Sequence, residues 1–218
     1  MRRLGLLVLL GLMTMMVSPA AVFVLTFEGL QNYEPIGGFY NGGLGGSGSG
    51  PGPNYGVVFD GPSLALIDAD AGGSGNFANE PSPSTIMFFL DDNASIMSVA
   101  AGFDTGFSFY YTSSVAGSVQ VYDDVNGGGN LMATLNFDPT SFACSGDPTG
   151  GFCEFRAAGI GFAGIAKSIK FSGVANQTGF DNITFGSRDP GGVVPEPSSL
   201  ALLGSALVGI GVWRRRRA

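Results

Sequence analysis

The stretch that decides the fold runs from residue 106 to residue 137 and reads GFSFYYTSSVAGSVQVYDDVNGGGNLMATLNF. Its first run places Phe107, Phe109 and Tyr111 on one face of an extended chain. Its last run places four apolar side chains on one face: Leu131, Ala133, Leu135 and Phe137. Alternation with a period of two is typical of strands that have one buried and one wetter face. The stretch therefore predicts strands, joined by a polar hairpin turn over residues 123–130.

Similar short runs extend from Val22 to about Arg188, among them VFVLTFE, STIMFFL, SIMSVAAGFD, SIKFSG and FDNITFG. Most of them end at Gly, Asn, Asp, Ser or Pro, which mark turns, and no helical period persists between them. About eight to ten short strands predict a mainly β fold, a single jelly-roll-like β-sandwich over residues 21–186. A Gly-rich loop near 41–54 is too rich in Gly and Ser to form a helix or pack a core.

The N-terminus has the layout of a secretory signal peptide over residues 1–20. Arg2 and Arg3 precede an apolar stretch, and small residues including Ala20 follow it. An uncleaved membrane anchor or a buried helix is the alternative. The protein is expected to be exported.

Charge is distributed unevenly between the ends and the middle of the chain. Six of the ten basic residues lie at the termini, which leaves four basic and sixteen acidic residues in the middle portion, a formal charge of −12. Such a surface repels phosphate backbones, so nucleic-acid binding is not expected. The chain has no histidine, which excludes Ser-His-Asp and Cys-His catalytic arrangements, and we expect no enzymatic activity.

The two cysteines, Cys144 and Cys153, flank a short loop, SGDPTGGF. In an oxidising compartment this pair is expected to form a disulfide, with two free thiols as the alternative.

Two candidate cation sites follow from the acidic residues. Glu28 ends the first predicted strand and Asp181 lies in the last, and these strands lie close together in a jelly-roll; a structural calcium ion could then bind both carboxylates, completed by backbone carbonyls. The alternative is two strand-edge carboxylates in water. The polar turn holds three further oxygen ligands, Asp123, Asp124 and Asn126, although its spacing does not match an EF-hand.

Aromatic side chains are candidates for sugar binding, because their faces stack on the C–H surfaces of sugars. Most aromatics in strands belong to the core, so packing is the competing interpretation for each one. The candidates are Tyr33, Phe39, Tyr40, Tyr55, Tyr110, Tyr111 and Tyr122.

The C-terminus has four parts in order. A spacer, residues 187–194, leads to an extended Pro195-Glu196-Pro197 element. Residues 198–213 are uncharged and, as a helix of about 24 Å, fall a little short of a hydrocarbon core of about 30 Å. Four arginines follow, as expected on the cytoplasmic side of a membrane helix. A plain single-span anchor is the simplest alternative.

This segment, VPEPSSLALLGSALVGIGVWRRRRA, resembles the PEP-CTERM sorting signal, also called the ice-binding protein C-terminal domain. The resemblance covers residues 195–218 and implies export, followed by processing by an exosortase, in a Gram-negative bacterium that makes exopolysaccharide. It implies that Pro195, Glu196 and Pro197 form the recognised motif. It also implies a stop-transfer role for four residues: Arg214, Arg215, Arg216 and Arg217.

The remainder of the chain resembles, more loosely, the β-sandwich domains that often precede this signal, in segments such as FEGLQNYEPIGGFYNG and FDNITFG. The resemblance implies a protein of the cell surface or extracellular matrix. Its expected role is structural or carbohydrate-binding, in exopolysaccharide or biofilm. A surface-anchored hydrolase acting on polysaccharide is the alternative.

Replacing Pro195, Glu196 and Pro197 by alanine is expected to leave the protein membrane-bound and unprocessed, because the recognised motif is lost while the apolar segment stays. Fractionation of cells and the mass of the protein on a denaturing gel measure this. Unchanged processing would show that the segment is only an anchor.

Overall fold

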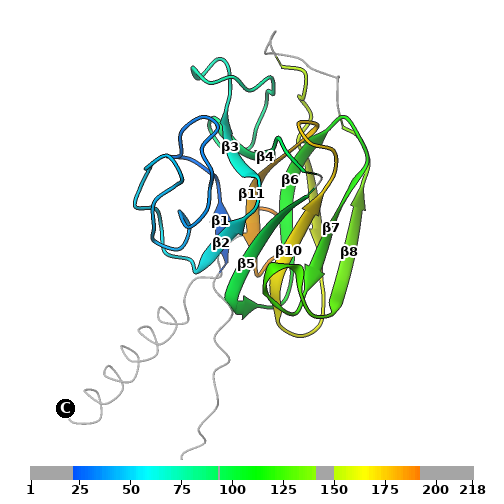
Figure 1. The fold of residues 1–218 in the computed structure, drawn as a ribbon. Coiled ribbons are helices and arrows are strands. Elements are labelled where there is room, and N and C mark those ends of the chain that lie inside the picture. The colour runs from blue at the N-terminus through cyan, green and yellow to red at the C-terminus, as the bar shows by residue number, and fades with distance from the viewer. Residues whose placement is uncertain (1–21, 93, 141–149, 192–218) are drawn as a thin grey trace, which may run out of the picture. The chain divides into compact units, whose positions relative to one another are not determined.

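The computed structural model describes residues 22–92, 94–140 and 150–191, all within one of two compact units of the chain, Ala20–Val194. These residues form eleven strands and one short 3-10 turn, η1 (Val125–Gly127). The strands make two sheets whose ladders are antiparallel (Figure 1). The expected mainly β, two-sheet sandwich is confirmed, and the jelly-roll subtype stays a prediction.

The first sheet has the order β3-β4-β11-β6-β9, and β1 also pairs with β11. Its strands are β1 (Phe23–Leu25), β3 (Ser63–Ile67), β4 (Thr85–Phe89), β6 (Phe107–Ser113), β9 (Arg156–Ile160) and β11 (Thr178–Phe185). On one edge of β11, β4 pairs with Gly179 and Phe180, while β1 pairs with residues 183–185. Asp181 and Asn182 therefore lie in a gap between two strands that share one edge.

The second sheet has the order β2-β5-β10-β7-β8. Its strands are β2 (Val57–Asp60), β5 (Ala94–Phe103), β7 (Gly117–Tyr122), β8 (Leu131–Phe137) and β10 (Ala166–Ser172). In Figure 1, β5, β10, β7 and β8 run side by side in this sheet. The predicted hairpin is β7 and β8, paired from Gly117 with Phe137 to Tyr122 with Leu131.

The core between the sheets is largely aromatic. Phe107 and Phe109 of β6 are fully buried and pack against Phe171 of β10 and Phe180 of β11, with ring centroids 5.5–6.2 Å apart. Edge-on contacts of this kind add to the free energy of burying the rings. The inward alternation predicted for residues 107–111 is confirmed, and the strand-like run SIKFSG likewise buries Ile169 and Phe171 in the core.

Sequence reasoning was wrong about one residue of β8 and missed two strands. Leu131 is 51% exposed, because the register with β7 shifts between Val121 and Tyr122 and places Met132 against the core. Strands β3 and β9 read SLALI and RAAGI, which lack the β-branched and aromatic enrichment of typical strands.

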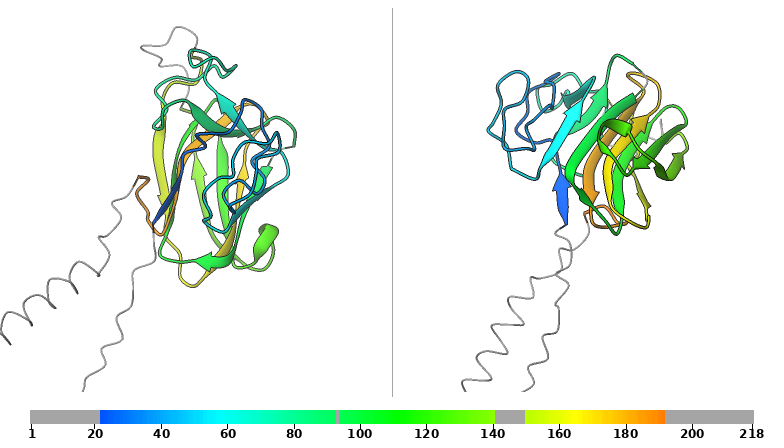
Figure 2. Two further views of the ribbon diagram at one scale, coloured as in Figure 1. Left: turned by 90° about the vertical axis from the view of Figure 1, so that its left-hand side faces the viewer. Right: turned by 60° about the horizontal axis from the view of Figure 1, so that its bottom comes forward.

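The Gly-rich loop has a fixed structure, organised by a buried carboxylate. Glu34 has no exposed surface, and its Oε1 accepts hydrogen bonds from the backbone N–H groups of Ser47 and Ser49, at 2.8 and 3.0 Å. Its Oε2 accepts from the N–H of Gln31 at 2.6 Å. The segment between β1 and β2, blue to cyan in Figure 2, lies at one side of the sandwich. As expected, the loop is not helical and gives no side chain to the main core; its Gly50 and Gly52 lie against Phe39, which precedes the loop and belongs to that core.

Replacing Glu34 by Gln keeps the shape of the side chain but turns an N–H donor toward one of three N–H groups. We expect a loss of about 2 kcal/mol in the free energy of unfolding and hydrogen exchange at the amides of Ser47 and Ser49 that is at least about tenfold faster. Ser47→Ala removes only an exposed hydroxyl and serves as the control. Unchanged exchange in the Gln variant would contradict the role of Glu34.

Candidate functional site

The aromatic residues that were candidates for sugar binding differ in how much of their surface is exposed. Phe39, Tyr40 and Tyr111 are at most 5% exposed and belong to the core, so the sugar-binding prediction is wrong for these three. Tyr55 stacks against Phe23 and Tyr40. Tyr33 is 45% exposed and packs beside Phe88, with ring centroids 5.9 Å apart. It is the strongest of the original candidates.

Phe88 belongs to a second hydrophobic cluster, on the outer face of the first sheet. Along β4, Met87 and Phe89 enter the main core, whereas Ile86 and Phe88 point the other way. The cluster consists of Leu66, Phe77, Ile86 and Phe88, with Leu64, Phe152 and Phe155 packed against it. Both faces of this part of the sheet are therefore apolar.

Two irregular segments cover the outer cluster and are tied to each other by their backbones. The N–H groups of Gly151 and Phe152 donate to the carbonyl of Asn76, at 2.5 and 3.1 Å, and the N–H of Ala78 donates to the carbonyl of Phe152 at 3.1 Å. Phe77 and Phe152 form an isolated parallel bridge. This pairing holds Asn76 and Phe152 above β11.

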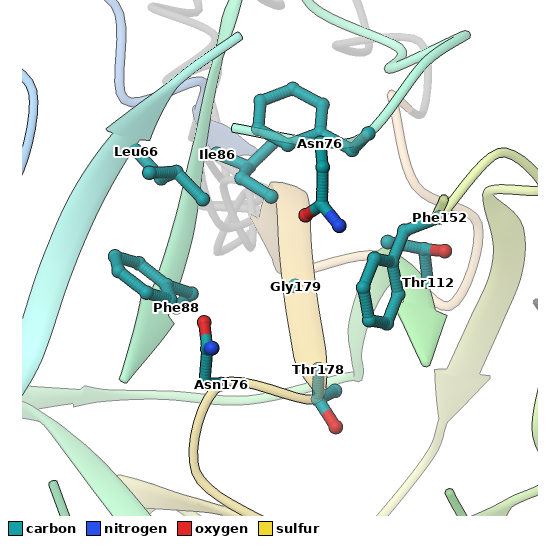
Figure 3. Close-up of a pocket in the computed structure, with 10 residues that line it drawn as sticks. Leu66, Asn76, Ile86, Phe88, Thr112, Phe152, Asn176, Thr178 and Gly179 are labelled. Carbon is teal, nitrogen blue, oxygen red and sulfur yellow. The ribbon is translucent and has the colours of Figure 1, made fainter. Parts of the chain in front are cut away.

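A small pocket lies between these segments and the sheet (Figure 3). Its floor is Gly179 of β11, which pairs with Phe88 on one side and Thr112 on the other. Its apolar walls are formed by Leu66, Phe77, Ile86, Phe88 and Phe152. A Cβ atom at this position would lie 2.5 Å from Cδ1 of Ile86, so a side chain there would have to displace the tip of Ile86 and would take up space at the floor.

The polar side chains among the described lining residues of the pocket are all neutral. Thr178 Oγ1 lies 2.8 Å from Ser113 Oγ, and Thr112 Oγ1 lies 3.3 Å from Thr140 Oγ1, so both hydroxyls have partners. The carboxamides of Asn76 and Asn176 point into the pocket from opposite sides (Figure 3). Neither carboxamide makes a hydrogen bond within the part of the chain that the structure describes, and both residues are exposed. They are available to a ligand.

Asn176 is positioned by the turn before β11. Its backbone is in the left-handed region, with φ of 58°, and its N–H donates to the carbonyl of Phe89 at 2.8 Å. Asparagine tolerates this conformation better than most residues. Sequence reasoning missed the pocket, because Asn76, Gly179 and Phe152 come from three distant segments and no local pattern connects them.

Glu28 and Asp181, predicted to meet between the first and last strands, do lie close enough to interact electrostatically. Asp181 has no exposed surface; the Ser82 N–H and the Asn182 N–H donate to it at 2.8 and 2.7 Å. Glu28 accepts from the N–H groups of Ser84 and Thr85, at 3.1 and 2.8 Å. Asp181 therefore fastens the segment before β4 to the gap along β11, and Glu28 fastens the start of β4 to the segment after β1.

No group of three or more acidic or cysteine side chains within the described ranges could hold a metal ion. The calcium ion proposed at Glu28 and Asp181 therefore needs backbone or hydroxyl oxygens as further ligands, and it stays a prediction.

In the β7–β8 turn, Asp123 accepts hydrogen bonds from the N–H and the side-chain amide of Asn130, at 2.6 and 2.9 Å. That carboxylate closes the hairpin turn.

Several predicted residues lie outside the described part of the chain. These are the sorting residues Pro195, Glu196 and Pro197, the four arginines, the signal peptide and Cys144. Cys153 is described and is 5% exposed, and its disulfide with Cys144 stays a prediction. No helix of the described residues is long and apolar enough to cross a membrane; the segment expected to do so, 198–213, is not among them.

Comparison with protein families gives one match, the model described as the PEP-CTERM protein-sorting motif, over residues 193–217. The chain carries a PEP-CTERM sorting motif. This confirms the resemblance of the C-terminal segment, and the motif implies an exported protein that an exosortase processes at the membrane. The match covers only the C-terminal end and gives no family to the β-sandwich.

No curated protein matches the chain in sequence. Among solved structures, the K2 cleaved adhesin domain of Lys-gingipain aligns with 76% of this chain and 99% of its own, at 13% identity and a TM-score of 0.48. A family 6 carbohydrate-binding module aligns with 60% of this chain and 86% of its own, at 17% identity and a TM-score of 0.39. CsCBM6-3 from Clostridium stercorarium, in complex with cellobiose, aligns with 59% of this chain and 85% of its own, at 16% identity and a TM-score of 0.38. These likenesses are too distant to indicate a ligand.

The buried carboxylate of Asp181 makes stability depend on pH. Burial raises its pKa to about 6; hydrogen bonds from Ser82 and Asn182 act in the opposite direction, and the charge of Glu28 adds to the rise. A carboxyl group whose pKa is higher in the folded state stabilises the fold at low pH, and this contribution is lost as the pH rises through about 6. We expect the free energy of unfolding of the wild type, relative to Asp181→Asn, to grow by on the order of 1 kcal/mol between about pH 7.5 and pH 5.

Asp138→Asn, which removes an exposed carboxylate, is the matched control for charge. A bound cation would reverse the sign, because it keeps both carboxylates ionised, and acid would then destabilise the fold. Melting with excess EDTA separates the two situations. A melting temperature that EDTA lowers in the wild type but not in Asp181→Asn would support the calcium site, and one unaffected by EDTA would contradict it.

Proposed function

We propose that the protein, once exported and processed, is a cell-surface or matrix component that binds a neutral polysaccharide on the outer face of its first sheet. The observation that carries this proposal is the pocket itself: among its described lining residues none is charged, and two carboxamides that make no hydrogen bond with the described part of the chain face each other between aromatic walls. Such carboxamides can each donate and accept a hydrogen bond, as sugar hydroxyls do.

The surroundings of the pocket support a polymer as the ligand. The pocket is too small to enclose a sugar ring, with a volume of about 20 Å³, so a saccharide has to lie across its mouth. Tyr33 extends the apolar surface beyond Phe88 and is exposed enough to stack on a neighbouring sugar unit. A chain of linked sugars can use both contacts at once, which raises its affinity over that of a single sugar.

Charge favours a neutral partner. The middle portion of the chain has a formal charge of −12, so uronate-rich or sulfated polymers are repelled. Among the described residues that line the pocket, none has an ionisable side chain that could serve as acid or base. We therefore propose binding without catalysis.

The proposal is tested with the exopolysaccharide of the producing cells, immobilised for affinity measurements. The wild type is expected to be retained, whereas the double variant Asn76→Ala/Asn176→Ala loses at least about tenfold in affinity, because each lost hydrogen bond costs about 1 kcal/mol. Tyr33→Ala is expected to lose about threefold to tenfold.

The matched control is Asn136→Ala, which removes an exposed carboxamide from β8 in the opposite sheet. Its affinity should equal that of the wild type, and the melting temperatures of all variants confirm that they fold. Retention of the double variant at wild-type strength would show that polysaccharide binds elsewhere. No retention of the wild type would refute the binding role itself.

A further inference from the structure

The size of the pocket limits what part of a sugar can enter it. A volume of about 20 Å³ holds one group about the size of a water molecule or a methyl group. A pyranose ring is several times larger, so the ring stays outside. The group that enters has to be a substituent of the ring.

The walls of the pocket select an apolar tip for that substituent. Leu66, Ile86 and three phenylalanine rings surround the space, and the two threonine hydroxyls at its edge already have partners. A sugar hydroxyl placed there would lose its hydrogen bonds with water and gain none, which costs free energy. A methyl group gains from the same surroundings.

The carboxamides of Asn76 and Asn176 add a second requirement. Together they offer two NH2 groups as donors and two carbonyl oxygens as acceptors at the mouth of the pocket. The methyl group of a deoxy sugar leaves them unpaired, and an acetate ester pairs only with their donors. An acetamido group has a methyl tip, a carbonyl that accepts from one carboxamide and an N–H that donates to the other.

We propose that this pocket binds the acetamido group of an N-acetylated hexosamine in the polysaccharide. The inference rests on the proposed function and names the class of sugar that the same site recognises. The floor at Gly179 lets the methyl group approach the backbone of β11, since any side chain there would occupy the space. A free amine, left by removal of the acetyl group, brings a positive charge and no methyl group, so the pocket rejects it.

The experiment compares matched hexasaccharides by calorimetric titration with the full exported chain. The probes are β-1,4-linked and β-1,6-linked hexamers of glucose, N-acetylglucosamine and glucosamine, in about 0.5 M salt, which screens attraction between the acidic surface and the amine. At least one N-acetylated hexamer is expected to bind about tenfold or more tightly than its glucose counterpart. The matching glucosamine hexamer is expected to bind no better than glucose.

Three variants test whether the selectivity comes from the pocket. Asn76→Ala and Asn176→Ala are each expected to lose about fivefold in affinity for the N-acetylated hexamer and little for the glucose hexamer. Gly179→Ala is expected to abolish the preference by filling the floor. If that variant does not fold, the two asparagine variants still decide the question. Asn136→Ala is the control.

The outcomes separate the inference from the function on which it rests. Equal affinities for N-acetylated and glucose hexamers, both weakened by the asparagine variants, overturn the acetamido assignment and keep polysaccharide binding at this site. A preference for acetamido sugars that survives the asparagine variants also overturns the assignment. Failure of every hexamer to bind, while the native exopolysaccharide is retained, overturns the acetamido inference alone. Failure of the native polymer overturns the proposed function.

Discussion

The buried carboxylate of Asp181 is the contact on which the rest of the first sheet depends. Strands β4 and β1 both pair with the same edge of strand β11. Between them, the register of β11 with β6 shifts after Asp181. Asp181 lies at this shift and accepts hydrogen bonds from Ser82 and Asn182. A charge without exposed surface is costly, and these hydrogen bonds offset only part of that cost, since burial still raises the pKa of Asp181. The segment before β4 is thereby held against β11, and the outer-face pocket is built beside it.

The aromatic core was predictable from sequence, because burial in a strand repeats with a period of two. In the runs around Phe107, Phe109 and Phe171, the alternation alone indicates which side chains are buried, and no knowledge of the neighbouring strands is needed. The pattern failed at Leu131, where a shift in register with β7 reverses the faces. Such shifts depend on the neighbouring strand, so a pattern read along one strand does not contain them. The strands β3 and β9 were missed for a related reason: their place in the sheet comes from pairing with stronger neighbours.

The sorting motif and the candidate binding site differ in how they are encoded. A short linear segment carries the motif, so its residues can be recognised in order along the chain. The pocket brings Asn76 and Asn176 together from positions 100 residues apart, with Phe152 from a third segment. Glu28 and Asp181 lie between these two cases. The expected strand order predicted that the two carboxylates lie near each other, but it did not predict the hydrogen bonds that Ser82, Ser84 and Thr85 donate to them. Sites assembled by tertiary contacts become visible only when the sheet order is known.

The position of the pocket on β11 also has a mechanical consequence. Gly179 lies near the start of this strand and Asn176 in the turn just before it, and the sorting motif follows the other end of the strand along the chain. A pull between a ligand at the pocket and the C-terminal end of the chain therefore runs along β11. Hydrogen bonds in antiparallel ladders stand perpendicular to the strands, so those to β4, β1 and β6 are loaded together in shear. Shear requires many bonds to break at once, whereas peeling breaks them singly, so this geometry would resist a pull between the proposed ligand and the C-terminal end of the chain.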